Sequence, residues 1–319
     1  MKLDYISLDY SDQSYENIQM FVGVDDSNLS VLKKHFKVDF IMRNHTLKFE
    51  QTDLKDLIKE VVDTCFEMID THHHLSEQDI TYFISLAKTH RLSQFNIHQL
   101  EPVGKTKNGK IIYPKTLGQA IFCDALRHND IIFATGVAGT GKTYLAVTYA
   151  VSLLKAEKIE KIILTRPAVE AGESLGFLPG DMKEKVDPYL RPLYDALYEM
   201  MGVETVERLM EKQVIEIAPL AFMRGRTLSN SVVILDEAQN STRSQMKMFL
   251  TRMGQNTKMI INGDVSQIDL IKKADSGLIE AVRLLKGIPS ISLIHLSQDD
   301  VVRNPLVQKI IERYAEIEK

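Results

Sequence analysis

The chain has 319 residues, a mass of 36.3 kDa and a net charge of −4, with 44% hydrophobic and 26% charged residues. This length allows two domains, and the acidic balance excludes a protein that coats nucleic acid through bulk charge, although it permits local basic patches. The two cysteines lie in apolar helical patterns. No apolar run approaches membrane-spanning length, and the N-terminus lacks the apolar core of a signal peptide. We therefore expect a soluble cytoplasmic protein without membrane contact.

The first part of the chain predicts a small α+β front domain. Its acidic start indicates only a short strand near residues 18–22. A helix is predicted over residues 29–35, and residues 38–42 and 45–50 predict a hairpin with Asn44 in its turn.

Two amphipathic helices follow the hairpin. Thr52 is expected to cap the first, which runs to Ile69, and the capping box of Ser76 and Asp79 starts the second. The three consecutive histidines 72–74 cannot all face one metal ion from a helix, so we expect an exposed turn between the two helices.

The order helix, two strands, helix resembles the minimal core of a KH-type RNA-binding domain, although the G-x-x-G loop of that domain is absent. Five basic residues either contact RNA phosphates or form a solvated face: Lys33, Lys34, Lys37, Arg43 and Lys48. Residues 101–110 are rich in Pro, Gly and Lys and predict a linker or a β-turn excursion. We therefore place the domains at residues 1–105 and 106–319.

Residues 136–143 read GVAGTGKT and lie between an apolar strand pattern and a helix pattern, which is the context of a P-loop. The glycines let successive N–H groups curl around a phosphate, and the helix that follows directs its N-terminal dipole at the same anion. Lys142 is expected to reach the β- and γ-phosphates of ATP, and the Thr143 hydroxyl to bind Mg²⁺. The expected nucleotide-binding residues are Gly136, Val137, Ala138, Gly139, Thr140, Gly141, Lys142 and Thr143.

Gln119 lies one helix before the P-loop strand. An amide at this place can pair with both the N6 donor and the N7 acceptor of adenine, so Gln119 is a candidate for contact with the base. The alternative is a glutamine on the helix surface.

Residues 161–165 predict the next buried strand, which leads into the segment RPAVEAGESLGFLPGD. Loops at the carboxyl ends of parallel strands hold ligands in open α/β sheets. Arg166, Glu170 and Glu173 are therefore candidates for substrate or partner contact, and a purely structural loop is the alternative.

The run VVILDEAQ places Asp236 and Glu237 at the end of an apolar strand. Downstream of a P-loop, the aspartate is expected to hold Mg²⁺ through its water shell, and the glutamate to polarise the attacking water as a general base.

The strand 258–261 ends in NGDVSQ, where Gln267 or Asn262 is expected to sense the γ-phosphate; a turn with an aspartate cap is the alternative.

Arg303 follows the last predicted strand and is a candidate to supply transition-state charge, in its own or a neighbouring subunit. Its rivals for this role are Arg166, Arg224 and Arg226.

The segments GVAGTGKT, LTRPAVEAGESLGFLPGD, VILDEAQN and NGDVSQIDL together resemble the PhoH-like family of P-loop ATPases over most of residues 110–319. The resemblance implies an additional-strand RecA-like fold, ATP hydrolysis, a link to RNA processing and ring-like oligomers. It also implies an endoribonuclease partner, because longer bacterial members are associated with such an enzyme in ribosomal RNA maturation.

We therefore expect an α/β protein: a RecA-like P-loop NTPase core, with a mostly parallel sheet and helices on both faces, behind the small α+β domain. The favoured function is an RNA-linked, helicase-like ATPase. A nucleotide-gated adaptor for an endoribonuclease is the alternative, and a small-molecule kinase ranks last because Glu237 favours attack by water. The single ATPase domain predicts a homo-oligomer that closes its site with a second subunit.

Overall fold

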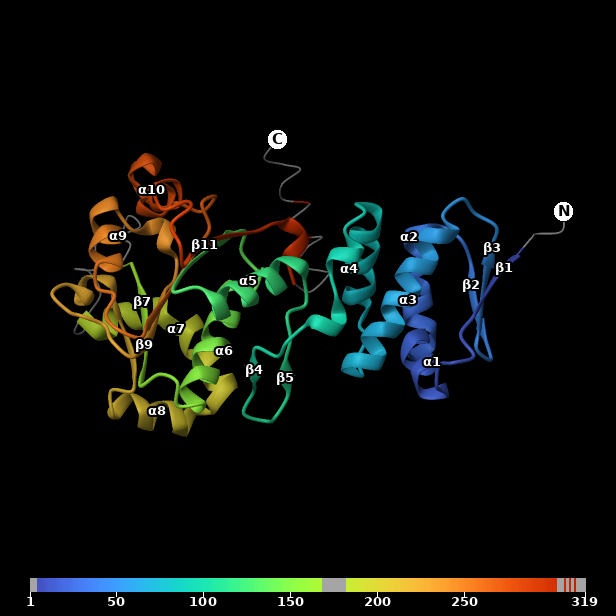
Figure 1. The fold of residues 1–319 in the computed structure, drawn as a ribbon, viewed down its shortest axis with the longest axis horizontal. Helices are drawn as coiled ribbons and strands as arrows, with labels where there is room; N and C mark the ends of the chain where they lie inside the picture. Colours follow the sequence, from blue (N-terminus) through green and yellow to red (C-terminus); the bar gives the residue numbers. More distant parts are fainter. Residues whose placement is uncertain (1–4, 168–181, 303–306, 308–309, 311–312, 314–319) are drawn as a thin grey trace. The chain divides into compact units, whose positions relative to one another are not determined.

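The computed structural model describes residues 5–167 and 182–302, together with positions 307, 310 and 313. The chain divides into two compact units, Met1–Leu100 and Glu101–Lys319 (Figure 1). In the described ranges, no helix is long and apolar enough to cross a membrane.

The first unit combines a small antiparallel sheet with helices. Its strands are β1 (Tyr5–Asp9), β2 (Phe40–Arg43) and β3 (Thr46–Glu50). Its helices are α1 (Tyr15–Val22), α2 (Ser27–Phe36), α3 (Lys55–His72) and α4 (Glu77–Lys88). The strands pair in the order β1-β3-β2, and α1, α2 and α3 lie on one side of them (Figure 1).

The hairpin prediction is confirmed, with Asn44 at φ 45° in the turn, and so is the capping box that starts α4. The predicted exposed turn at 72–74 is confirmed for His73, which ends α3 in the left-handed conformation, and for His74, whereas His72 is the last residue of α3 and is half-buried. The predicted Thr52 cap is displaced: α3 begins at Lys55, and the Thr52 hydroxyl accepts the N–H of Leu54 instead.

The prediction of a strand over residues 18–22 is wrong. This segment belongs to α1, where the Ser14 side chain caps the first turn and Ile18 and Phe21 are buried at helical spacing. The first strand lies earlier and was not predicted; its alternation is short, with Ile6 and Leu8 buried between exposed neighbours.

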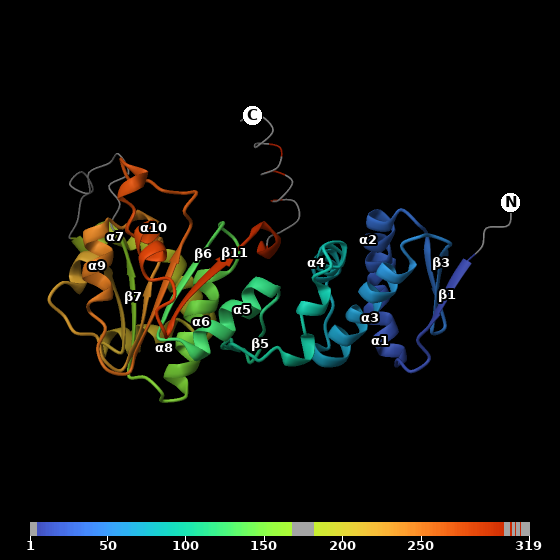
Figure 2. The same ribbon diagram turned by 45° about the horizontal axis from the view of Figure 1, so that its top comes forward.

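The second unit is built on a six-stranded parallel sheet. The strands are β6 (Ile131–Gly136), β7 (Lys161–Arg166), β8 (Ile215–Pro219), β9 (Ser231–Leu235), β10 (Thr257–Gly263) and β11 (Ile291–Leu296). They lie in the order β11-β6-β10-β9-β7-β8. Figure 2 shows β11 beside β6. A short hairpin of β4 (Gly104–Lys105) and β5 (Ile111–Ile112) precedes them.

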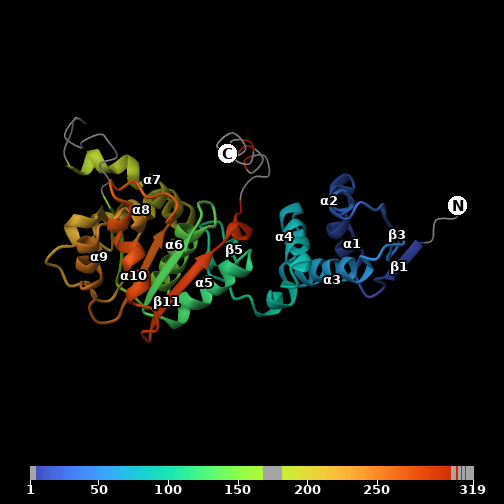
Figure 3. The same ribbon diagram turned by 90° about the horizontal axis from the view of Figure 1, so that it is seen from above.

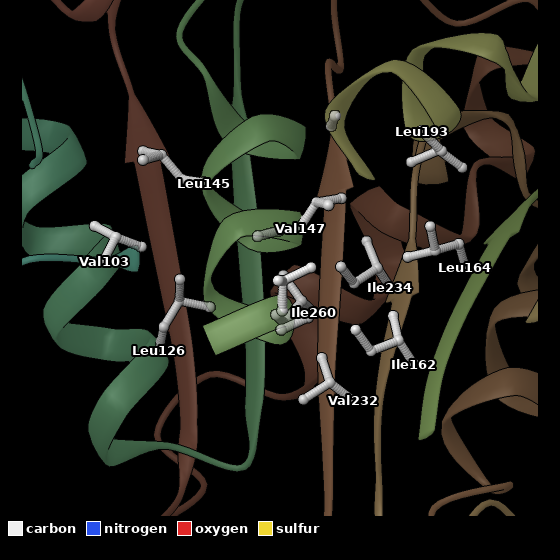
Figure 4. Close-up of a cluster of buried hydrophobic side chains, with 14 of the residues drawn as sticks. Val103, Leu126, Leu145, Val147, Ile162, Leu164, Leu193, Val232, Ile234 and Ile260 are labelled. Atoms are coloured by element: carbon white, nitrogen blue, oxygen red, sulfur yellow. The ribbon is translucent and has the colours of Figure 1, made fainter. Parts of the chain in front are cut away.

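Helices cover both faces of this sheet, because successive strand residues point to opposite sides. The helices are α5 (Leu117–His128), α6 (Lys142–Lys155), α7 (Met182–Met201), α8 (Val203–Glu211), α9 (Arg243–Leu250) and α10 (Gly277–Leu284). One face packs Ile162, Val232 and Ile260 against α5–α8 (Figure 4). The opposite face packs Ile163 and Val233 against α9 and α10 (Figure 3).

Strand β10 lies between the P-loop strand β6 and strand β9, which confirms the predicted additional-strand α/β fold. Since all six strands are parallel, their carboxyl ends share one edge of the sheet. The P-loop, Arg166, Asp236 and the segment after Gly263 all lie at or just after strand ends on this edge.

Candidate active site

The P-loop joins β6 to α6 through backbone conformations that favour glycine. Gly136 has φ 144°, and a Cβ there would lie 2.1 Å from the carbonyl oxygen of Leu296 in β11. Gly141 has φ 80° and forms the N-cap of α6. The loop therefore packs against the edge strand on one side and presents the first turn of α6 on the other.

A segment from the far end of the chain also holds the P-loop. The Val302 N–H donates to the Gly139 carbonyl at 3.0 Å. Two residues earlier, the buried Asp300 carboxylate accepts the Gly118 N–H at the start of α5, also at 3.0 Å. These contacts fix the loop against the segment that follows β11.

Lys142 is buried, and its ammonium group is directed back into the loop. Its Nζ donates to the carbonyl of Gly136 at 2.7 Å, to that of Val137 at 2.8 Å and to the Thr140 hydroxyl at 3.2 Å. A cation is thus fixed inside the phosphate loop by the loop's own oxygens.

Thr143 and Asp236 meet across the site, where the Thr143 hydroxyl donates to Asp236 Oδ1 at 2.6 Å. Burial raises the pKa of the Asp236 carboxyl above its ordinary value, and the neighbouring Glu237 raises it further. The hydrogen bond from Thr143 and the charge of Arg166 act in the opposite direction. Burial dominates, so the charged carboxylate is held in an environment that favours a cation beside it.

The Glu237 carboxylate is held on both oxygens. Arg166 Nη2 lies 3.0 Å from Oε1, and the Gln239 side-chain amide donates to Oε2 at 2.6 Å. The backbone of Glu237 is left-handed, with φ 51°, which is uncommon for a residue with a side chain. The candidate base is therefore aimed by its backbone and fixed by two partners.

A cavity of about 450 Å³ lies at this edge of the sheet. It is lined by Ala138, Gly139, Gly141, Lys142, Thr143, Tyr144, Pro192, Asp195, Ala196, Glu199, Asp236, Glu237, Gly263, Asp264 and Gln267. Among these lining residues, five are carboxylates and one is a lysine. Tyr144 donates to Glu199 Oε1 at 2.9 Å, and burial raises the pKa of its hydroxyl.

These residues fit a magnesium–nucleotide complex. The Thr143 hydroxyl and the Asp236 carboxylate are the hard oxygen ligands that Mg²⁺ prefers. Among the described residues, the buried polar atoms without a hydrogen-bond partner include Asp264 Oδ2, whose residue lines the cavity, and the side-chain amide of Asn262 in β10. Buried groups of this kind are normally satisfied by a ligand or water.

Gln119 is buried, and its amide is bonded to the protein backbone. Its Oε1 accepts the Lys115 N–H at 2.8 Å, and its Nε2 donates to the Thr140 carbonyl at 3.0 Å. The side chain lies 3.1 Å from the place a Cβ on Gly141 would occupy. Gln119 is thus placed behind the P-loop, away from the helix surface, and the adenine contact stays a prediction.

The candidate arginines lie in different places. Arg166 pairs with Glu237, and Arg226 makes two hydrogen bonds of 2.6 and 2.7 Å with the carboxylate of Glu216. Arg224 is exposed. The remaining candidates, Arg303, Glu170 and Glu173, fall outside the described residues.

A family model described as PhoH-like protein matches residues 111–315. A PhoH-like protein of Bacillus subtilis (strain 168) is 54% identical over 300 residues, which cover 94% of each chain. The chain belongs to the PhoH-like family. A PhoH-like protein of Mycobacterium leprae (strain TN) is 46% identical over 93% of this chain and 85% of its own.

The large terminase of a thermophilic bacteriophage is a structural neighbour of this PhoH-like chain, with a TM-score of 0.38 and 13% identity over 59% of this chain and 46% of that chain. A likeness of that size adds nothing to the family assignment. The family and the P-loop sheet together indicate a nucleotide-binding P-loop ATPase.

Sequence reasoning missed Gln239, whose amide also contacts the segment after β10. Its Oε1 accepts the Asp264 N–H at 3.0 Å, and its Nε2 donates to the Gln267 carbonyl at 3.1 Å. The only sequence feature that could have indicated this role is the position of Gln239 two residues after Glu237, where the chain turns sharply. Arg166 was identified as a candidate, but its pairing with Glu237 requires the sheet order and was not predicted.

Proposed function

We propose that this PhoH-like protein hydrolyses ATP in an RNA-linked, helicase-like process. The observation that carries the proposal is the convergence of Lys142, Thr143, Asp236 and Glu237 on one cavity. These four residues come from two segments of the chain, the P-loop with its helix and the end of β9, and supply the parts that phosphoryl transfer to water needs.

Each residue has a definite part in this chemistry. Bound Mg-ATP supplies the transferable γ-phosphoryl group and the charge of the metal. Lys142 and the N–H groups of the loop would hold the phosphates, and Thr143 and Asp236 would hold the metal. Glu237 accepts a proton from the attacking water, with Gln267 or Asn262 near the γ-phosphate.

The charge of the cavity supports a homo-oligomer. The triphosphate is an anion, and among the described lining residues one lysine stands against five carboxylates. Mg²⁺ neutralises part of this charge, but in-line transfer is usually aided by an arginine as well. Of the described candidates, Arg166 and Arg226 are both paired with glutamates, so we propose that another subunit supplies this further positive charge.

The charge of the first unit favours the alternative of an adaptor. Residues 1–100 hold 16 acidic and 10 basic side chains, a net charge of −6, whereas residues 101–319 hold 27 acidic and 29 basic ones, a net charge of +2. A unit with this balance suits a protein partner, such as an endoribonuclease, better than RNA phosphates. In this alternative, ATP gates the binding of that partner and no strand is unwound.

The test is steady-state phosphate release from ATP by the full chain, with and without single-stranded RNA, beside Glu237→Gln. Turnover that RNA raises several-fold and that Glu237→Gln abolishes supports the RNA-linked ATPase. Turnover indifferent to RNA supports the adaptor, and wild-type turnover no higher than that of Glu237→Gln overturns the proposed ATP hydrolysis. Sedimentation of the active species checks the oligomer, which a fully active monomer would exclude.

A further inference from the structure

The side chain of Gln239 joins two parts of the site that are distant in sequence. It is completely buried, with none of its surface exposed to solvent. Its Nε2 donates both to Glu237 Oε2 and to the Gln267 carbonyl, while its Oε1 accepts the Asp264 N–H. One amide therefore connects the candidate base to both ends of the segment 264–267.

We propose that Gln239 is a positioning residue that sets the place of the Glu237 carboxylate according to the position of segment 264–267. The inference rests on the proposed ATPase function. Arg166 pairs with Oε1 of Glu237, and a contact at one oxygen leaves the carboxylate free to rotate. The second contact, from Gln239 to Oε2, fixes the carboxylate plane.

The link to segment 264–267 is close-packed. A Cβ added at Gly263 would lie 3.0 Å from Gln239 Oε1 and 3.2 Å from its backbone nitrogen, so β10 approaches Gln239 as closely as a glycine allows. The same segment carries Asp264 and Gln267, which line the cavity where the γ-phosphate is expected. A shift of this segment would therefore pull on the amide and turn Glu237.

The next residue offers a matched control. The Asn240 side chain is also a buried amide, and it holds Asp269 in the same way: Oδ1 accepts the Asp269 N–H at 2.8 Å and Nδ2 donates to Asp269 Oδ2 at 3.2 Å. Both of these bonds anchor the chain after the segment, and neither involves Glu237. Their loss should cost stability alone.

The experiment compares Gln239→Met and Asn240→Leu in the full chain, measuring kcat and KM for ATP, the Kd of a fluorescent ATP analogue and the Tm. Methionine keeps the length of glutamine but cannot donate to Glu237. We expect Gln239→Met to lower kcat by about 10- to 100-fold, which is part of the rate acceleration that a positioned general base contributes. The Kd of the ATP analogue should stay within about threefold of the wild-type value. Asn240→Leu should lower the Tm but leave kcat within about threefold of wild type.

Failure of the ATPase function and failure of the positioning role give different results. If wild type releases no more phosphate than Glu237→Gln, the ATPase function itself is absent. If wild type is active, the positioning role is overturned when Gln239→Met keeps wild-type kcat, or when Asn240→Leu loses as much kcat as Gln239→Met.

Discussion

The Thr143 hydroxyl lies 2.6 Å from Asp236 Oδ1, so the first turn of α6 and the end of β9 are joined directly at the expected metal site. Two oxygen groups of the kind that Mg²⁺ prefers, and that would hold it in the proposed site, are thereby brought together. The arrangement places a buried carboxylate beside a neutral hydroxyl, and its charge is best balanced by a cation.

Asp236→Asn should stabilise the metal-free chain and abolish its response to Mg-ATP. Burial raises the pKa of Asp236, so the folded chain binds this proton more tightly than the unfolded chain. The carboxyl therefore contributes stability at pH values below its ordinary pKa, and this is lost as the pH rises through the raised pKa. At pH 8 in EDTA, Asp236→Asn should have a higher Tm than wild type, by about 2–4 °C for each kcal/mol that it adds to the free energy of unfolding.

Thermal unfolding with EDTA and with Mg-ATP checks this expectation. Wild type should gain Tm on adding Mg-ATP, and the gain should shrink as the pH is lowered toward the raised pKa of Asp236. A metal-free Asp236→Asn variant less stable than wild type would contradict the argument from burial.

Arg166→Ala should slow turnover, whereas Arg226→Ala should mainly affect stability. Arg166 lies 3.0 Å from Glu237, while Arg226 holds Glu216 in β8, a residue that does not line the cavity. We expect about a tenfold loss of kcat for Arg166→Ala, comparable to about 1.4 kcal/mol. Arg226→Ala should cost at most about 1 kcal/mol of stability, because the pair is partly exposed.

Kinetics and unfolding of the two variants side by side provide the measurement. Equal losses of kcat in both would show that the effect comes from general disruption of the sheet edge.

Gln119→Leu should weaken the binding of ATP and GTP to the same extent. The Gln119 amide is hydrogen-bonded to two backbone atoms, the Lys115 nitrogen and the Thr140 oxygen. Removing the amide therefore loosens the P-loop. Since the P-loop is expected to bind phosphates, which ATP and GTP share, both nucleotides should be affected. Dissociation constants for ATP and GTP measure the effect, and Thr116→Ala, which removes only the helix cap, is the control. A loss confined to ATP would instead support the adenine contact expected from the sequence.

Arg43→Gln and Lys48→Gln should have little effect on any RNA binding by the full chain. Both residues are exposed on the two-stranded hairpin of a unit that carries a net charge of −6, and Lys33 on α2 is already paired with Asp39. If the pair contacted phosphates, the double variant would weaken binding and reduce the slope of log affinity against log salt by about 2. Titration of labelled single-stranded RNA at several salt concentrations distinguishes the cases.

Much of the ATPase unit could be predicted because its strands are buried on both faces. Runs such as 131–134 and 232–235 are continuously apolar, and the residues needed for phosphate chemistry follow directly after them. The first unit was harder: β1 has only two buried positions, Ile6 and Leu8, and short alternation is a weak pattern.

Partners that meet only in three dimensions could not be predicted. The pairing of Arg166 with Glu237 requires β7 and β9 to be neighbours, and the bond from Gln239 to Asp264 requires β10 beside β9. Sequence order gives neither adjacency. The bonds of Gln119 to the backbone were likewise hidden, because they depend on how α5 packs behind the P-loop.

The hydrogen bond from Val302 to Gly139 couples the segment just after β11 mechanically to the P-loop. A force or a binding partner acting on the chain after β11 would reach the loop through a single hydrogen bond and the Asp300 contact to α5. Movement of the P-loop would, in turn, be conveyed to residues 300–302 through the same two contacts.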